Sequence, residues 1–211
     1  MNGKMKRARS GFICVLVAIA SVSGVNANDP RTHLDPSPRN STPNSVHSSS
    51  GRLHPFAKDA RHWLLTEGFS RSPTKGDVYL TQLHVSRYFR DNLAILFGGT
   101  IGYADAKRAD GGVFGGPELG VRWHFAQDEK WSTYLDGSIG AVFHEEAITP
   151  DSLRFNFDLQ LGVGVTYHLS KQMMVLGGLR SFHLSNARIQ GKDNNLGFDA
   201  PLIYIGLMSS F

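Results

Sequence analysis

The chain has 211 residues, of which 41% are apolar and 19% are charged, and its formal net charge is +4. This length predicts one domain or a small pair of domains. A mean hydropathy of -0.21 excludes a bundle of transmembrane helices, and the one long apolar run, residues 11–25, is too short and too N-terminal for a stable span.

Residues 1–27 have the three parts of a secretory signal peptide in order. A basic start is followed by an apolar stretch at 12–20 and by the small-x-small sequence Val25-Asn26-Ala27. We therefore predict export with cleavage after Ala27; a buried N-terminal helix is the alternative. The single cysteine, Cys14, lies in this segment, so the mature chain is expected to have no thiol, disulfide or cysteine metal site. A nucleophile in the mature chain would therefore be an oxygen.

The predicted signal also carries the excess positive charge. Its removal takes away four basic residues and no acidic one, which leaves 18 of each sign. A neutral chain has no broad basic surface, so nucleic-acid binding is not expected. The next stretch, residues 28–58, is rich in Pro, Ser and Asn and poor in apolar residues. Such a composition predicts a flexible leader.

From residue 59 to residue 211 the dominant hydropathy period is two, as in strands with one apolar face. The clearest case is 153–169, where apolar residues from Phe155 to Tyr167 alternate with polar or small ones. Eight such stretches are predicted as strands, near 60–70, 77–90, 92–105, 113–126, 131–143, 153–169, 172–185 and 199–211.

An even number of long strands, with an apolar outer face and a polar inner face, is typical of a transmembrane β-barrel. Together with export, the pattern predicts an all-β, eight-stranded antiparallel barrel in a bacterial outer membrane. A soluble sandwich or a lipocalin-like barrel is the alternative, but its strands would usually be shorter. The chain ends in Phe211, on the parity of Ile203, Ile205 and Leu207, and this pattern is similar to the last strand of outer-membrane barrels.

The joins between the predicted strands alternate in length. Short joins near residues 90–91, 127–130 and 170–171 alternate with long ones. Bacterial barrels have short periplasmic turns and longer external loops, so the seventh strand is predicted to run outward. Its end near residues 183–185 is then expected at the level of the outer leaflet, which consists of lipopolysaccharide.

Three polar residues are predicted to meet on the outside of the barrel at this level. If Arg180 points into the lumen, as a charge at its depth should, His183 and Ser185 face lipid, because residues two apart project the same way. Asp199 shares the parity of the apolar residues of the last strand, and the hairpin brings it alongside His183. Polar groups on a lipid face are disfavoured, so this set indicates a function. Interfacial polar residues without catalysis are the alternative.

Ser185, His183 and Asp199 form the residue set of a serine hydrolase. An imidazole that takes the hydroxyl proton activates serine as a nucleophile, and a carboxylate holds the imidazole in the right tautomer. Asn186 and Asn195 carry amide donors in the adjoining loop. Either amide is a candidate to stabilise the oxyanion of a tetrahedral intermediate.

The segment Phe182-His183-Leu184-Ser185-Asn186-Ala187, followed by Asn195-Leu196-Gly197-Phe198-Asp199 and a closing strand that ends in Phe211, resembles the lipid A 3-O-deacylase (PagL) family. The resemblance covers about residues 60–211, and 116–125 is also similar to an inner strand of that family. It implies a lipid-facing site in which His183 is the base, Ser185 the nucleophile and Asp199 the acid, with Asn186 and Asn195 in the motif.

Two positions depart from the family pattern. Asp199 stands where the family usually carries Glu, which shortens the reach to His183 by one methylene. Arg188 stands where the family often has Gly, so a backbone N–H of the oxyanion hole is expected to be shaped differently. Asp193 is the less favoured candidate for the acidic position that Asp199 is predicted to fill.

Other candidate residues have structural interpretations. His84, His124 and His168 are predicted to be lumen residues bonded to neighbours such as Glu118 or Asp158, and no metal site is predicted. The remaining candidates are the exposed pair Glu145-Glu146, the loop cations Lys107, Arg108, Arg188 and Lys192, which could grip lipid A phosphates or be ordinary loop charges, and interfacial Trp63, Trp123 and Trp131.

The sequence therefore predicts an outer-membrane ester hydrolase that, by the resemblance, removes the 3-position acyl chain of lipid A and needs no cofactor. A non-catalytic small barrel with a structural or adhesion role is the alternative. An acyltransferase that uses the same three residues is a third hypothesis. Whether the barrel is a monomer or a homodimer is left open by the sequence.

Overall fold

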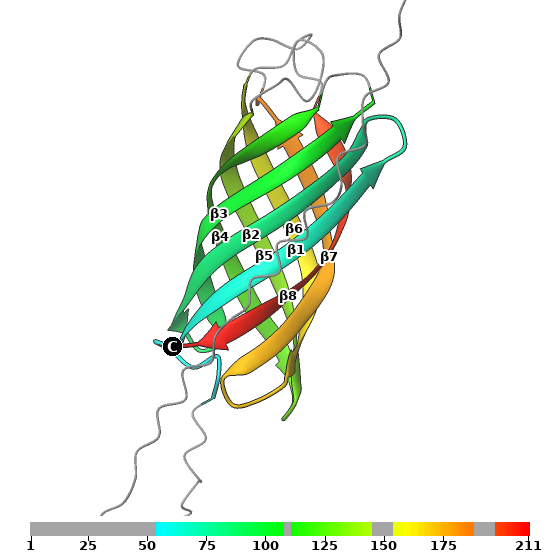
Figure 1. Cartoon of the computed structure of the whole chain (residues 1–211). Helices are drawn as coiled ribbons and strands as arrows, with labels where there is room; N and C mark the ends of the chain where they lie inside the picture. Colours follow the sequence, from blue (N-terminus) through cyan, green and yellow to red (C-terminus); the bar gives the residue numbers. More distant parts are fainter. Residues whose placement is uncertain (1–53, 108–110, 145–153, 188–196) are drawn as a thin grey trace, which may run out of the picture. The chain divides into compact units, whose positions relative to one another are not determined.

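The structure, a computed structural model, describes residues 54–107, 111–144, 154–187 and 197–211. The predicted signal peptide and most of the predicted leader lie outside these ranges. In the described residues, eight strands form one closed antiparallel barrel in chain order, with β1 hydrogen-bonded to β8 (Figure 1). The strands are β1 (Arg61–Ser72), β2 (Gly76–Arg90), β3 (Leu93–Ala106), β4 (Gly112–Gln127), β5 (Trp131–His144), β6 (Phe155–His168), β7 (Met173–Ser185) and β8 (Phe198–Ser210).

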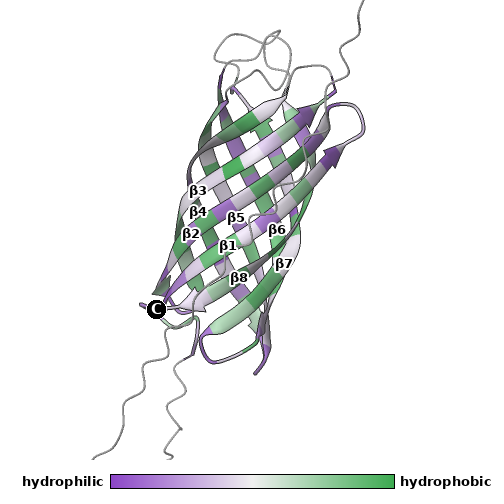
Figure 2. Ribbon diagram, in the orientation of Figure 1, coloured by the Kyte–Doolittle hydropathy of each residue, from purple (hydrophilic) through white to green (hydrophobic). Residues whose placement is uncertain are grey.

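The alternation in sequence becomes an apolar outside and a largely polar inside. Phe97, Leu161 and Ile205 are each more than 60% exposed on the outer surface, whereas Arg122 and Gln160 are buried in the lumen. Figure 2 shows the same alternation of apolar and polar residues along the strands. A surface of this kind is stable in lipid, and closure leaves no strand edge unpaired there. The expected barrel class is therefore confirmed.

A charged network fills the middle of the lumen. The Asp136 carboxylate accepts hydrogen bonds from Arg122 and Arg180, in each case with 2.7 Å between Nη2 and Oδ2. The two guanidinium groups also lie over the rings of Tyr134 and Tyr204, each 4.0 Å from the ring centroid. These bonds link β4, β5, β7 and β8 from within and fix the inward face of β7.

Two glycines make room for the tyrosines of this network. A Cβ atom at Gly164 would lie 2.3 Å from the Tyr134 ring, and one at Gly178 would lie 2.8 Å from the Tyr204 hydroxyl. Both distances are shorter than real contacts, so a side chain at either position would displace a tyrosine. The two hydroxyls, 2.7 Å apart, therefore meet across the lumen.

The segment before β1 closes the end of the barrel that carries the C-terminus. Phe56 is 1% exposed and stacks on His124, with 3.8 Å between the ring centroids. The Phe56 carbonyl accepts a hydrogen bond from the Asn92 amide, which ties the segment to the β2–β3 turn. Asn92 has a φ of 68°, a left-handed conformation that Asn tolerates.

The same end carries the short joins 91–92, 128–130 and 169–172 and all three tryptophans. Trp63, Trp123 and Trp131 are 40–50% exposed on the outer surface there, in the position of an interfacial aromatic girdle. Short turns face the periplasm in bacterial barrels, so β7 ends and β8 begins at the external end. No helix in the described part of the chain is long and apolar enough to cross a membrane.

Candidate active site

The candidate site lies where β7 ends and β8 begins. The two strands pair antiparallel, and their register places His183 opposite Asp199. Arg180 is 7% exposed and points into the lumen. The prediction that His183 and Ser185 face outward depended on this orientation of Arg180. His183 and Ser185 share the opposite parity and lie on the outer surface at the external end.

A continuous series of hydrogen bonds joins the three side chains. His183 Nδ1 is 2.5 Å from Asp199 Oδ1, and His183 Nε2 is 2.8 Å from Ser185 Oγ. With Nδ1–H donated to the carboxylate, the lone pair of Nε2 is free to take the serine proton. This is the geometry that an activated serine nucleophile needs.

The three side chains of this hydrogen-bonded series differ in exposure. The Asp199 side chain is 65% exposed and the His183 side chain 40%, whereas Ser185 is only 8% exposed. The register places Phe157 of β6 beside Ser185 and Leu159 beside His183. Ser185 is therefore buried beside two apolar residues of the lipid-facing surface.

Gly197, the last described residue before β8, packs directly against this set. A Cβ atom built on Gly197 would be 3.1 Å from the Leu184 carbonyl oxygen, 3.3 Å from Ser185 Cβ and 3.5 Å from His183 Cε1. A larger residue would press on Ser185 and His183. The glycine of the motif thus has a packing role at the site.

Sequence reasoning missed a fourth polar residue, Lys75. It belongs to the turn between β1 and β2, and its Nζ lies 3.5 Å from Asp199 Oδ2 and donates a hydrogen bond to the Gly197 carbonyl. Closure of the barrel is the signal that could have found it. In a closed barrel β1 pairs with β8, so the external β1–β2 turn must lie beside the start of β8.

Comparison with known proteins identifies the family. The profile of the family described as lipid A 3-O-deacylase (PagL) matches residues 52–207. The chain belongs to the PagL family. A sequence search of curated proteins finds no match.

Solved structures agree with this fold. The outer membrane enzyme PagL is similar with a TM-score of 0.52 and 18% identity, over 68% of this chain and 97% of that chain. Neisserial surface protein A is similar with a TM-score of 0.50 and 12% identity, over 72% of this chain and 96% of that chain. The protein is thus a PagL-family barrel of the Gram-negative outer membrane.

One of the two asparagines of the PagL-like motif lies within the described residues. Asn186 directly follows Ser185 and is 1% exposed. Ala187, next in the chain, has a φ of 51°, so the backbone turns sharply just after Ser185 and Asn186. Asn195 lies outside the described residues, as do Arg188 and Asp193.

Two of the three histidines expected in the lumen of this PagL-family barrel, His84 and His124, are buried there, whereas His168 is half-buried with its ring 6.0 Å from that of Phe56. His84 Nε2 lies 3.3 Å from Glu118 Oε2. The His124 ring nitrogens hydrogen-bond Tyr88 and Ser132 at 2.9 and 2.8 Å. Within the described ranges, no group of three His, Cys, Asp or Glu side chains is placed to hold a metal ion. Glu145-Glu146 and three of the loop cations, Arg108, Arg188 and Lys192, lie outside those ranges.

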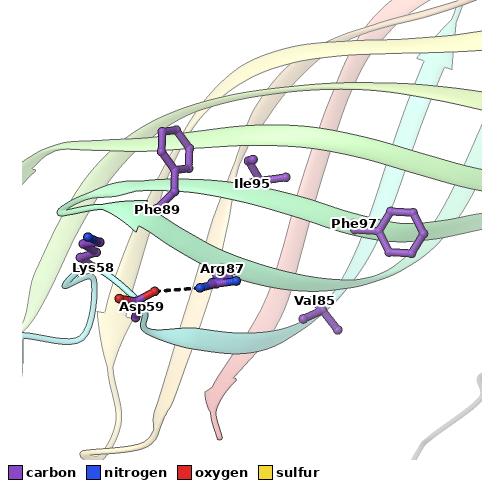
Figure 3. A pocket seen from close by; sticks show the side chains of 7 residues that line it. All are labelled: Lys58, Asp59, Val85, Arg87, Phe89, Ile95 and Phe97. Atoms are coloured by element: carbon purple, nitrogen blue, oxygen red, sulfur yellow. Dashed lines mark hydrogen bonds and ion pairs between the residues drawn. The ribbon is translucent and has the colours of Figure 1, made fainter.

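A groove of about 440 Å³ lies at the other end of the barrel (Figure 3). It is formed on the outer face of β2 and β3 by apolar residues that include Phe89 and Phe97, and by the segment before β1. Arg87 Nη2 donates to Asp59 Oδ1 at 3.0 Å beside it, and this bond lowers the pKa of the Asp59 carboxyl. The groove is at the periplasmic end, so it takes no part in the Ser185 site.

Proposed function

We propose that this protein hydrolyses the ester that links a 3-hydroxyacyl chain to position 3 of lipid A. The observation that carries the proposal is the unbroken chain from Ser185 through His183 to Asp199 on the lipid-facing surface. Membership of the lipid A 3-O-deacylase family supports the substrate. The external end of the barrel is also where lipopolysaccharide lies.

The reaction proceeds through an acyl-enzyme. Ser185 Oγ attacks the ester carbonyl carbon while His183 Nε2 accepts the hydroxyl proton. The tetrahedral intermediate then collapses, and His183 returns the proton to the sugar oxygen that leaves. Water, deprotonated by His183, attacks the acyl-serine, and the 3-hydroxy fatty acid is released with Ser185 restored.

Asp199 keeps the imidazole in position through these steps. Its carboxylate accepts Nδ1–H and stabilises the imidazolium that forms twice in each cycle. The oxyanion requires donors as well. We assign this role to an amide of Asn186 or Asn195, or to a backbone N–H of the same loop. Proton transfer and hydrogen bonding account for every step, so the mechanism requires no cofactor.

The outward position of the site explains how such a substrate arrives. Lipid A diffuses laterally in the outer leaflet and does not need to enter the lumen, which the Arg122, Arg180 and Asp136 network fills. Its acyl chain would lie along Leu159, which is 51% exposed on the outer face.

The test is mass spectrometry of lipid A incubated with the refolded barrel in detergent. The wild-type protein is expected to remove one 3-hydroxyacyl mass, and Ser185→Ala is expected to remove none. Ser181→Ala is the matched control, because Ser181 is exposed on the same face of the same strand and has no part in the mechanism. All three proteins must show the same heat-modifiable folding.

The alternatives predict different masses. An acyltransferase would add an acyl mass to lipid A when a phospholipid donor is supplied. A non-catalytic barrel would leave lipid A from several sources unchanged. Equal activity of wild type and Ser185→Ala would refute the assigned nucleophile even if deacylation occurred.

A further inference from the structure

The turn between β1 and β2 places a lysine ammonium beside Asp199, the carboxylate of the candidate triad. Lys75 precedes Gly76, and the pairing of β1 with β8 places this turn beside the start of β8. The Lys75 ammonium lies 3.5 Å from Asp199 Oδ2. The other carboxylate oxygen, Oδ1, is the one that contacts His183.

We propose that Lys75 is a positioning residue that holds the Asp199 carboxylate in line with His183. The inference rests on the proposed function, since it assigns Lys75 to the same triad. One ammonium contacts both the outer oxygen of Asp199 and the carbonyl of Gly197. It therefore joins the acid to the backbone that packs against the base and the nucleophile.

Asp199 needs such a partner because its carboxylate is largely exposed. With 65% of the side chain exposed, packing restrains its rotamer little, and among the described contacts the bond to His183 aligns it from β7. Aspartate has a short side chain, so a rotation about χ1 removes Oδ1 from hydrogen-bond reach. A second charge-assisted contact on Oδ2 restricts that rotation.

The turn that carries Lys75 is itself held in place. The Lys107 amide donates to the Lys75 carbonyl at 3.0 Å, and Lys107 Nζ donates to the Pro73 carbonyl at 2.5 Å. Gly76 has a φ of 125°, and a Cβ atom there would lie 2.0 Å from the Asp105 carbonyl oxygen. The next residue after Lys75 is thus fixed as a glycine, and the ammonium is presented from a defined turn.

A different role for Lys75 would be to bind an anionic group of the substrate, such as a phosphate of lipid A. The two roles differ in what they affect. Positioning of Asp199 changes the reactivity of Ser185 toward any electrophile, whereas a phosphate contact changes the KM for lipid A alone. The test therefore needs a probe that carries no phosphate of lipid A.

The experiment measures phosphonylation of Ser185 by a fluorophosphonate probe together with kcat and KM on lipid A. In Lys75→Met, both the labelling rate and kcat are expected to fall about tenfold with little change in KM. Lys75→Arg, which keeps the charge, is expected to recover to within about threefold. Lys171→Met is the matched control, because Lys171 is exposed in a periplasmic turn, and it should behave as wild type.

A double-mutant comparison separates positioning from a general loss of structure. In Asp199→Asn the labelling rate is already low, and adding Lys75→Met is expected to reduce it no further. A full tenfold loss in that background would overturn the proposal. So would a Lys75→Met protein with normal labelling and a raised KM for lipid A, which is the result expected of a phosphate contact.

An NMR measurement decides the inference even if lipid A is not the substrate. The His183 Nδ1 proton, donated to the Asp199 carboxylate, is expected as a downfield resonance, absent in Asp199→Asn and shifted upfield or broadened in Lys75→Met. A wild-type protein that shows this resonance and is labelled, yet leaves lipid A intact, would refute the proposed substrate but not the role of Lys75. An unchanged resonance in Lys75→Met would refute that role.

Discussion

The buried charges of the lumen allow a quantitative prediction about folding. Asp136 is 5% exposed and Arg122 is 2% exposed, and they are bonded at 2.7 Å. Asp136 also accepts two hydrogen bonds from Arg180, at 2.7 and 3.1 Å. Replacing Asp136 by Leu removes the carboxylate that both guanidinium groups contact and leaves two buried cations.

Removal of one partner from a buried ion pair typically costs about 3–5 kcal/mol, because an uncompensated charge stays buried. With a denaturant dependence of about 2 kcal/mol per molar urea, the unfolding midpoint of Asp136→Leu should fall by roughly 1.5–2.5 M. The assay is urea titration of the barrel in lipid vesicles, followed by tryptophan fluorescence and by the heat-modifiable band on gels.

A companion variant checks the reason for this loss. Replacing Asp136 by Leu and both Arg122 and Arg180 by Met removes all three charges at once. Apolar replacement of a buried set of opposite charges is often neutral or stabilising, so this variant should recover part of the lost stability, while the buried Glu118, which reaches Arg180 through Gln82, stays in the lumen. A single variant within about 1 kcal/mol of wild type, or a triple variant as unstable as the single one, would refute the reasoning.

Three further predictions concern separate parts of the barrel. Phe56→Ala is expected to lower the free energy of unfolding by about 3–5 kcal/mol, because the ring is buried against His124; the same urea titration measures it, and a loss below about 1 kcal/mol would contradict it. Replacing both Glu67 and Thr81 by Val should stabilise the barrel by about 1 kcal/mol, because a carboxylate on the lipid face is disfavoured and Glu67 is exposed there. The replacement of Thr81 removes the hydroxyl that donates to Glu67 at 2.9 Å. Destabilisation would indicate a partner for this carboxylate. Gly197→Ala should slow ester turnover about tenfold at an unchanged unfolding midpoint, because the new Cβ atom would lie 3.3 Å from Ser185 Cβ. Normal turnover would contradict the packing role of Gly197.

The strands were predictable because the residues of each strand alternate between apolar and polar. The predicted stretch 131–143 became β5 (Trp131–His144), and 172–185 became β7 (Met173–Ser185). A period-two pattern needs no knowledge of partners, since lipid outside and a polar lumen inside select the face residue by residue. The meeting of His183 and Asp199 was predictable for a similar reason, because one hairpin register determines it.

Contacts that depend on closure of the barrel were not predictable in this way. Lys75 and Asp199 are far apart in sequence and meet only because β1 and β8 are neighbours. Phe56 was assigned to the flexible leader by composition, yet it is buried in the end of the lumen. A local pattern contains no information about which segment fills that space, because stacking on His124 is a tertiary contact.

The filled lumen supports the strand that carries the outward site. Arg180 and His183 lie three residues apart on β7, one pointing inward and the other outward. The bonds of Arg180 to β5 and β6 hold β7 from inside the lumen, so part of the support for His183 is independent of the surrounding lipid. The proposed hydrolysis of a membrane lipid needs such support, because fluid lipid cannot hold a catalytic side chain in place. The rigid support must therefore come from the side of the strand that the substrate never reaches.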